Sequence, residues 1–179
     1  TYPSLAKRLR FAHREKADIF ISLHADSVTE GIAKGTTIYT VSDQASDEIS
    51  ARIAQEHDRA ELLIGVDLRG AEDSIADVLI DLALQDSIPR SKALAETTIH
   101  GVRSVVGSVN AKPLRQANFS VLKSPDIPSV LIEVGFMSTQ SDLDNLLDEK
   151  WRMNFVQGVR NGILKWIGDD SIATPLRRQ

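Results

Sequence analysis

The chain of 179 residues is 42% apolar and 26% charged, with a formal net charge of −4, which is the composition of one folded domain. It has no cysteine and no apolar run of about 18 residues, so disulfide bonds, cysteine-ligated metals and transmembrane helices are excluded. The acidic balance, the few aromatic residues and the lack of a basic cluster argue against nucleic-acid binding.

The first part of the chain predicts a helix, two strands and a second helix. Residues 4–16 carry apolar side chains at the spacing of an amphipathic helix. Residues 18–24 are almost entirely apolar, which predicts a short strand buried on both faces, and the β-branched residues 36–41 predict a second strand. Acidic residues in the first turn favour a helix over 46–63, with Ser46 as its N-cap.

The second part predicts helices around two further strands. Pro89 has no N–H to donate inside a helix, so we expect it to separate one helix from the next. The expected elements are helices over 75–88 and 92–106, strands over 119–123 and 129–135, and helices over 141–147 and 151–167. Residues 171–179 show no periodic pattern and are expected to form a loose C-terminal tail.

Strands that alternate with helices predict an α/β fold with a mixed, largely parallel sheet flanked by helices. The charge is unevenly distributed, because residues 43–81 hold 11 acidic and 3 basic side chains and the remainder is mildly basic. This imbalance favours an inserted acidic helical segment, although a solvated acidic helix explains the charge equally well.

Two polar side chains stand where apolar strands end. In open α/β sheets, ligands gather at the carboxyl ends of strands, and both His24 and Glu133 are expected there. His24 can be a metal ligand, a catalytic base or an imidazole hydrogen-bonded at a strand end. Glu133 is expensive to bury unpaired, so it is paired with an arginine such as Arg115, bound to a metal or held for catalysis.

The remaining histidines are weaker candidates. His13 and His57 are expected on exposed, charged helix surfaces, and His100 is expected in a helix as a packing or surface residue. No HExxH, GxSxG, GxGxxG or phosphate-binding loop motif is present to suggest a different site.

Three runs of sequence, AHREKADIFISLHAD, GTTIYTVS and NFSVLKSPDIPSVLIEVGFMS, resemble in this order the zinc-dependent N-acetylmuramoyl-L-alanine amidases. The resemblance extends from Tyr2 to about Ile167, and SLHAD with LIEVGFMS is much more specific than either motif alone. The chain is most similar to the Gram-negative cell-division amidases, because of the long segment between Val41 and Ile75.

The resemblance implies a Zn²⁺ held by two histidines and a glutamate, with a water completing the site. His24 matches the second histidine ligand, and Glu133 matches the catalytic glutamate that acts as general base and acid. The family's other histidine and its ligand glutamate are expected before Thr1, so residues 1–170 would be a catalytic domain that lacks its N-terminal part. The implied reaction hydrolyses the amide between N-acetylmuramic acid and L-alanine in peptidoglycan.

The resemblance also implies regulation. In the cell-division members an inserted helix covers the active-site groove, and an acidic side chain from it can occupy the open position of the zinc. Residues 43–74 match this autoinhibitory insertion, with Glu61 as the best match and Glu56 as the second. A partner of the EnvC or NlpD (LytM-domain) type releases the helix, so we expect such an activator, a periplasmic location, a role in septal wall splitting and a monomer.

Two other functions are compatible with His24 and Glu133 at strand ends. One is a zinc carboxypeptidase that shortens the stem peptides of peptidoglycan, and its products would differ from those of an amidase. The other is a non-catalytic cell-wall-binding module, against which Glu133 argues because a pure binder has little use for a carboxylate at that strand end.

Overall fold

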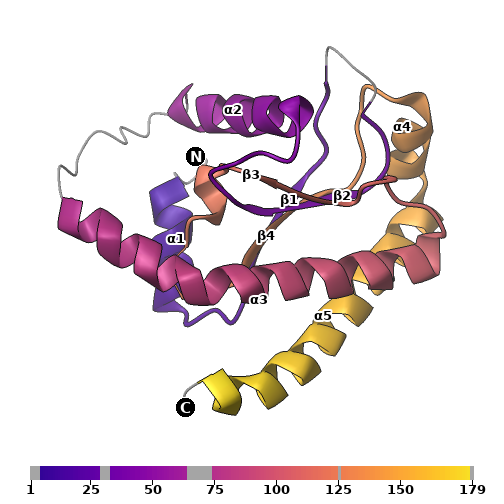
Figure 1. The fold of residues 1–179 in the computed structure, drawn as a ribbon. Helices are drawn as coiled ribbons and strands as arrows, with labels where there is room; N and C mark the ends of the chain where they lie inside the picture. Colours follow the sequence, from indigo (N-terminus) through magenta and orange to yellow (C-terminus); the bar gives the residue numbers. More distant parts are fainter. Residues whose placement is uncertain (1–4, 29–32, 64–73, 125, 178–179) are drawn as a thin grey trace.

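The computed structural model describes residues 5–28, 33–63, 74–124 and 126–177. Figure 1 shows a central sheet with helices on both sides. The elements, in chain order, are α1 (Leu5–Arg14), β1 (Phe20–His24), β2 (Thr37–Val41), α2 (Glu48–Leu63), α3 (Ser74–Val106), β3 (Leu114–Ala117), a 3₁₀ turn (Ser120–Leu122), β4 (Ser129–Glu133), α4 (Gln140–Leu147) and α5 (Glu149–Arg177). Within these ranges, no helix has both the length and the apolar character needed to cross a membrane.

The described sheet has four strands in the order β1-β4-β2-β3. The pairs β1–β4 and β2–β3 are parallel, and β2–β4 is antiparallel. The prediction of an α/β fold with a mixed, largely parallel sheet flanked by helices is therefore confirmed. The β1–β4 register pairs His24 with Glu133, so the two candidate residues lie side by side at the carboxyl ends of parallel strands.

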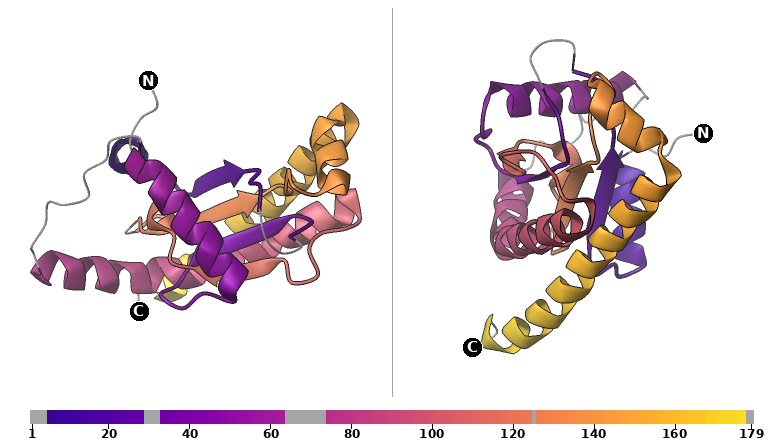
Figure 2. Two further views of the ribbon diagram at one scale, coloured as in Figure 1. Left: turned by 90° about the horizontal axis from the view of Figure 1, so that it is seen from above. Right: turned by 90° about the vertical axis from the view of Figure 1, so that its right-hand side faces the viewer.

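The two faces of the sheet carry separate hydrophobic cores. Consecutive strand residues point to opposite faces, so Tyr39 and Ile38 belong to different cores. The first core packs Tyr39 and Leu131 against Ile53 of α2, and the second packs Ile38 against α3 and α5. Figure 2 shows the same layers from two further directions, with α2 on one side of the sheet and α3 and α5 on the other.

The strand β1 is less buried than its sequence predicts. Its side chains are only partly covered, and Leu23 is 63% exposed, because β1 is the edge strand of the described sheet. The prediction of a strand buried on both faces is therefore wrong for β1.

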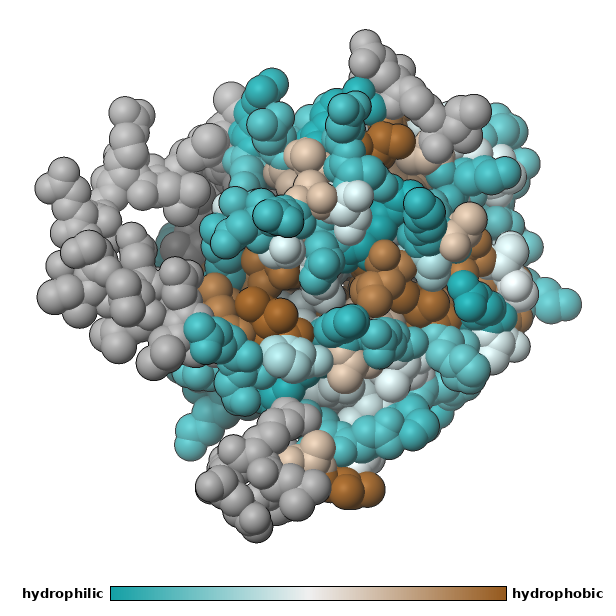
Figure 3. Space-filling model, viewed as in Figure 1, coloured by the Kyte–Doolittle hydropathy of each residue, from teal (hydrophilic) through white to brown (hydrophobic). Residues whose placement is uncertain are grey.

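Figure 3, in the orientation of Figure 1, shows a mostly hydrophilic surface on which some apolar side chains appear.

The second core also explains why Pro89 does not end a helix. Helix α3 runs through it from Ser74 to Val106, so the predicted break is wrong. Helix α5 holds this point of α3 from the side: Trp166 Nε1 donates to the carbonyl of Arg90 at 3.1 Å, and the Arg90 guanidinium pairs with Asp170 at 2.8 Å. Packing and this ion pair outweigh the one hydrogen bond that a proline removes.

The Arg90–Asp170 ion pair also fixes helix α5 near the C-terminal end of the chain. Asp170 is buried against α3, and α5 continues to Arg177. Residues 171–177 are therefore helical, and the prediction of a loose tail is wrong for them. The sequence lacked an apolar stripe there, whereas α5 is fixed to α3 directly before this segment by the Arg90–Asp170 charge pair.

The third predicted strand is displaced along the chain. Residues 114–117 form β3, and Ser120–Leu122 form a 3₁₀ turn, so the prediction of a strand over 119–123 is wrong. Phe119, Val121 and Leu122 are buried. The apolar run in the sequence therefore reflects their burial in the core and not a strand.

Helices α3 and α5 cross with their backbones in close contact. Glycines at 101, 158 and 162 occupy the crossing, and a Cβ added to Gly162 would lie 2.4 Å from the Cα of Thr98. A backbone atom cannot move aside as the end of a flexible side chain can. Only glycine therefore fits at this crossing.

We expect Gly162→Ala to lower the free energy of unfolding by about 1–3 kcal/mol, because the added methyl group forces the two helices apart. Urea denaturation followed by circular dichroism measures the change. Gly168→Ala is the matched control, since a Cβ at Gly168 meets nothing within 4 Å. Equal stability of the two variants would contradict the proposed crossing.

Candidate metal centre

His24 and Glu133 are fixed next to each other by the backbone. They form the last register pair of β1 and β4, and paired residues on neighbouring strands point to the same face of a sheet. The pairing continues beyond the strands, where the N–H of Val134 donates to the carbonyl of His24 at 2.9 Å. Glu133 is fully buried and His24 is half-buried. The structure thus brings together the two residues singled out from the sequence.

The loop after β4 is held by a buried carboxylate. Asp142 Oδ2 accepts hydrogen bonds from the N–H of Gly35 at 2.7 Å and from the N–H of Phe136 at 2.9 Å. Thr36 Oγ1 adds a bond to the carbonyl of Val134 at 2.8 Å. These bonds tie the segment before β2 to the segment after β4, so the end of β4 that carries Glu133 is rigidly placed.

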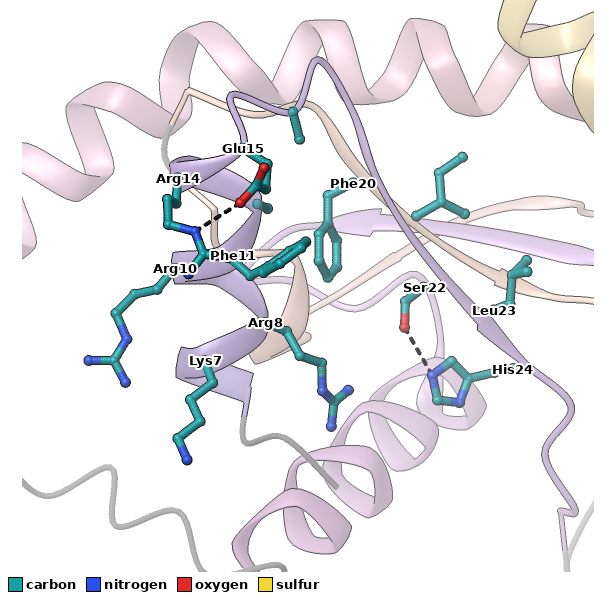
Figure 4. A pocket seen from close by; sticks show the side chains of 13 residues that line it. Lys7, Arg8, Arg10, Phe11, Arg14, Glu15, Phe20, Ser22, Leu23 and His24 are labelled. Atoms are coloured by element: carbon teal, nitrogen blue, oxygen red, sulfur yellow. Dashed lines mark hydrogen bonds and ion pairs between the residues drawn. The ribbon is translucent and has the colours of Figure 1, made fainter. Parts of the chain in front are cut away.

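The orientation of the His24 ring is set by Ser22. Alternate strand residues lie on one face, and Ser22 Oγ is 3.0 Å from His24 Nε2, as Figure 4 shows. When His24 donates this hydrogen bond, its proton is on Nε2 and Nδ1 carries a free lone pair. Metal-binding histidines are usually held in this way, with the second ring nitrogen donating to a fixed acceptor.

The residue nearest to that lone pair is His57, on α2. Its Nε2 lies 2.8 Å from His24 Nδ1, and the two ring centroids are 4.0 Å apart in an edge-on arrangement. His57 is only 9% exposed, so the prediction of an exposed surface residue is wrong. The spacing of Ile53, Ala54 and His57 along α2 could have revealed it, because these three positions form one buried helix face.

Asp26 closes the site from the loop after β1. Its Oδ1 is 3.8 Å from His24 Nδ1, and its N–H donates to Glu133 Oε2 at 3.2 Å. Burial would raise the pKa of Asp26, but side-chain hydrogen bonds with His24 and Glu133 outweigh it and lower the pKa. Asp26 is therefore ionised, as a metal ligand must be.

Glu133 behaves differently from Asp26. Burial, followed by the negative charge of Asp26, raises the pKa of Glu133 to about 9. Its Oε1 is buried, and no hydrogen-bond partner for it occurs within the described part of the chain. A buried polar atom without a partner is costly, so this oxygen fits a site that receives a water or a cation.

These side chains fit a zinc ion. One ligand atom each from His24, Asp26 and His57 lies within 4.8 Å of the others. Imidazole nitrogens and carboxylate oxygens are the ligands that zinc prefers where cysteine is absent. The donor set, the oriented imidazole and the unpartnered Glu133 oxygen therefore agree with a metal centre at the ends of β1 and β4.

The other residues that the sequence suggested for the site lie away from this centre or outside the described residues. Arg115 pairs with Asp47, so the alternative in which Arg115 neutralises Glu133 is wrong. Glu56 lies on the exposed side of α2. The side chain of Glu61 lies outside the described residues. Among the acidic and histidine side chains of α2 that the structure describes, His57 is the one that reaches His24.

An open cavity of about 1010 Å³ leads from solvent to His24. It lies between α1 and β1, and Figure 4 shows the side chains around it. Phe11 and Leu23, both largely exposed, contribute apolar walls. The cationic side chains along it are those of Lys7, Arg8, Arg10 and Arg14. His24 is therefore the residue of the centre that lines this open cavity.

Comparison with known proteins gives one consistent family. The family model described as N-acetylmuramoyl-L-alanine amidase (Amidase_3) matches residues 1–165. The N-acetylmuramoyl-L-alanine amidase AmiA of Salmonella typhimurium is 29% identical over 93% of this chain and 57% of its own length. The chain thus spans little more than half of this relative.

Solved structures agree at the level of the fold. The amidase AmiC2 of Nostoc punctiforme superimposes with a TM-score of 0.63 at 21% identity, covering 94% of this chain and 68% of that one. The CwlD amidase of Clostridioides difficile, solved in complex with the GerS lipoprotein, gives a TM-score of 0.60 at 19% identity, covering 92% and 61%.

The raised pKa of Glu133 predicts a pH-dependent stability of the metal-free protein. The pKa rises from its ordinary value of 4.5 to about 9, so between these values the folded state binds a proton that the unfolded state has lost. The free energy of unfolding therefore falls as pH rises through this window. We expect Glu133→Gln, which cannot ionise, to remove this fall.

Urea denaturation in EDTA from pH 5 to pH 8.5 measures the effect. We expect the Gln variant and the parent to be similar at the acid end, and the variant to be more stable at the alkaline end. Parallel pH profiles for the two proteins would contradict the burial of an ionisable Glu133. Glu149→Gln, in the exposed first turn of α5, controls for loss of one negative charge.

Proposed function

The chain belongs to the N-acetylmuramoyl-L-alanine amidase family, whose model covers residues 1–165, and from this premise we propose that it hydrolyses the amide bond between N-acetylmuramic acid and L-alanine in peptidoglycan. The observation that supports the proposal is the register pair of His24 and Glu133, which sets an imidazole that could hold a metal beside a buried carboxylate. The relatives named as amidases of this class support the same reaction.

His24 would hold Zn²⁺ through Nδ1, with Ser22 orienting the ring through Nε2. When bound, the zinc would lower the pKa of a water to about 7 and polarise the carbonyl of the scissile amide. We place the family's other two ligands, a histidine and a glutamate, in sequence that precedes Thr1. This assignment rests on the resemblance of SLHAD to the motif of the second histidine ligand.

Glu133 would move the proton. The pKa of about 9 is that of Glu133 in the metal-free site, and a cation bound beside it would favour the ionised carboxylate. Its Oε1, buried and without a partner among the described residues, would then accept a proton from the water that attacks the carbonyl carbon. Its Oε2 is held by the N–H of Asp26, so the carboxyl group keeps one orientation. As the C–N bond breaks, Glu133 returns the proton to the nitrogen of L-alanine, which leaves as an amine.

The groove beside His24 supports a polymeric substrate. It runs between α1 and β1 and opens to solvent, so part of a glycan strand with an attached peptide could lie in it, while access to the centre itself would require the displacement of α2. We place the reaction in the periplasm, in septal wall splitting by a monomer, following the similarity to the cell-division amidases.

Helix α2 supports an autoinhibited form of this enzyme. It packs on the same face of the sheet as Glu133 and His24, through Ile53 and Ala54. A helix in this place would cover the centre, as proposed for residues 43–74, and a partner would have to move it. The CwlD amidase has a protein partner, the GerS lipoprotein. For this chain we propose an activator of the EnvC or NlpD type.

We expect Glu133→Gln in the full-length protein to lower the rate of sacculus hydrolysis by about 10²–10⁴-fold, because the amide can neither take nor return the proton. Release of soluble peptides from purified sacculi measures the rate. Binding of the variant to sacculi should be retained. Unchanged hydrolysis would refute the role given to Glu133.

Analysis of the reaction products identifies the bond that is cleaved. An amidase releases intact stem peptides with a free L-alanine amino group and leaves a peptide-free glycan. A zinc carboxypeptidase would instead shorten the peptides and leave them attached, and a wall-binding module would release nothing. Mass spectrometry of the soluble and insoluble fractions separates the three outcomes, and only the first agrees with the proposal.

A further inference from the structure

The sequence motif LIEVGFMS continues beyond Glu133 and ends at Ser138, an exposed residue that neither the metal centre nor the proposed reaction uses. We propose that Ser138 is a positioning residue for Glu133, and that it acts by holding the loop after β1 in place. The proposal rests on the proposed function, because Glu133 is the base only in that reaction.

The segment after β4 is bonded to the loop after β1. The N–H of Met137 donates to the carbonyl of Asp26 at 2.8 Å, and the N–H of Val28 donates to Ser138 Oγ at 3.1 Å. These bonds continue the parallel pairing of β1 with β4 beyond the last register pair. The first contact joins two backbone groups, whereas the second depends on a side chain. Ser138 is therefore a link that a substitution can remove.

The loop after β1 in turn holds the carboxyl group of Glu133. The N–H of Asp26 donates to Glu133 Oε2 at 3.2 Å. Directly after this N–H the chain is fixed twice, by Met137 at the carbonyl of Asp26 and by Ser138 at Val28. A hydrogen bond weakens steeply when its donor turns away from the acceptor. The hydroxyl of Ser138 thus helps to set the orientation of the Glu133 carboxyl group.

The two segments are also anchored in the same hydrophobic core. Val28 and Phe136 are both buried in the core that packs against α2. Ser138 is exposed, so removal of its hydroxyl group leaves this core filled. The N–H of Val28 would lose its acceptor, and the loop would have to shift to find another one. We therefore expect a local displacement of the loop without unfolding of the domain.

The consequence for catalysis follows from the geometry of proton transfer. A base must lie within hydrogen-bond reach of the proton that it takes, and a misplacement of about 1 Å can lower a rate about 10²-fold. A loop that no longer directs the Asp26 N–H at Glu133 lets the carboxyl group turn. The loss belongs in kcat, because the hydrogen bonds that carry the effect lie within the protein.

The test compares Ser138→Ala with Ser138→Thr in the full-length protein. Threonine keeps the hydroxyl group, and its added methyl group can point to solvent. On a soluble peptidoglycan fragment, we expect Ser138→Ala to lower kcat about 10–100-fold with KM within about twofold of the parent, and Ser138→Thr to keep most of the rate. Ser104→Ala is the control, because it removes an exposed hydroxyl group that donates to the carbonyl of Gly101 at 2.8 Å.

A double variant separates positioning of the base from general damage. Residues that act through one another give non-additive effects, whereas independent effects add. In the Glu133→Gln background, we expect Ser138→Ala to leave the residual kcat unchanged, because the orientation of a missing base no longer matters. General structural damage would lower the rate in both backgrounds.

Hydrogen exchange followed by nuclear magnetic resonance tests the contact without any hydrolysis. In the metal-free protein, we expect the amide protons of Asp26 and Val28 to exchange at least about threefold faster in Ser138→Ala than in the parent, as loss of one hydrogen bond predicts. Ser138→Thr should match the parent. If the parent cleaves no sacculi, the proposed function fails, while the exchange rates still decide whether Ser138 holds the loop.

An unchanged kcat in Ser138→Ala would overturn the proposal, and so would equal losses in the Ala and Thr variants. A raised KM with an unchanged kcat would contradict it as well, because Ser138 would then bind substrate. An additive loss in the Glu133→Gln background, or unchanged exchange at Asp26, would exclude an action through Glu133. None of these results would refute the role of Glu133 itself.

Discussion

The parallel pairing of β1 with β4 is the constraint on which the candidate centre depends. In this register His24 and Glu133 are neighbours, Ser22 lies on the same face to orient the imidazole, and Asp26 follows in the loop. A slip by one residue would move a whole strand of side chains to the other face. The hydrophobic cores on both sides of β4 prevent such a slip, so packing fixes the positions of His24 and Glu133 relative to each other.

Burial raises the pKa of Glu133, and it lowers the stability of the fold when the carboxyl group ionises. The carboxyl group is removed from water, faces Asp26, and has one oxygen without a partner in the described part of the molecule. Such a group is better satisfied when a cation and a water are present. The same face receives α2, whose His57 Nε2 lies 2.8 Å from His24 Nδ1, so the proposed metal ligand, the proposed base and α2 belong to one polar cluster.

The sequence predicted the fold class and the position of His24 and Glu133 at strand ends, because polar residues that end apolar runs follow strong local rules, but it did not predict that the two residues are paired across neighbouring strands. It failed where distant contacts decide. Pro89 stays within α3, and α5 extends to Arg177, because the Arg90–Asp170 pair and Trp166 join the two helices. His57 was missed since its neighbours in sequence are charged, although its helix face is buried. Glu61 and Glu56 were chosen as matches to the acidic position of the family, and of the two only the side chain of Glu56 is described, on the exposed side of α2.

The most direct test of the account is a crystal structure of the full-length protein grown with Zn²⁺, with anomalous diffraction recorded at the zinc edge. We expect an anomalous peak within bonding distance of His24 Nδ1, with the Glu133 carboxyl group close by and Ser22 hydrogen-bonded to Nε2. A zinc peak elsewhere, with His24 bonded only to protein groups, would contradict it.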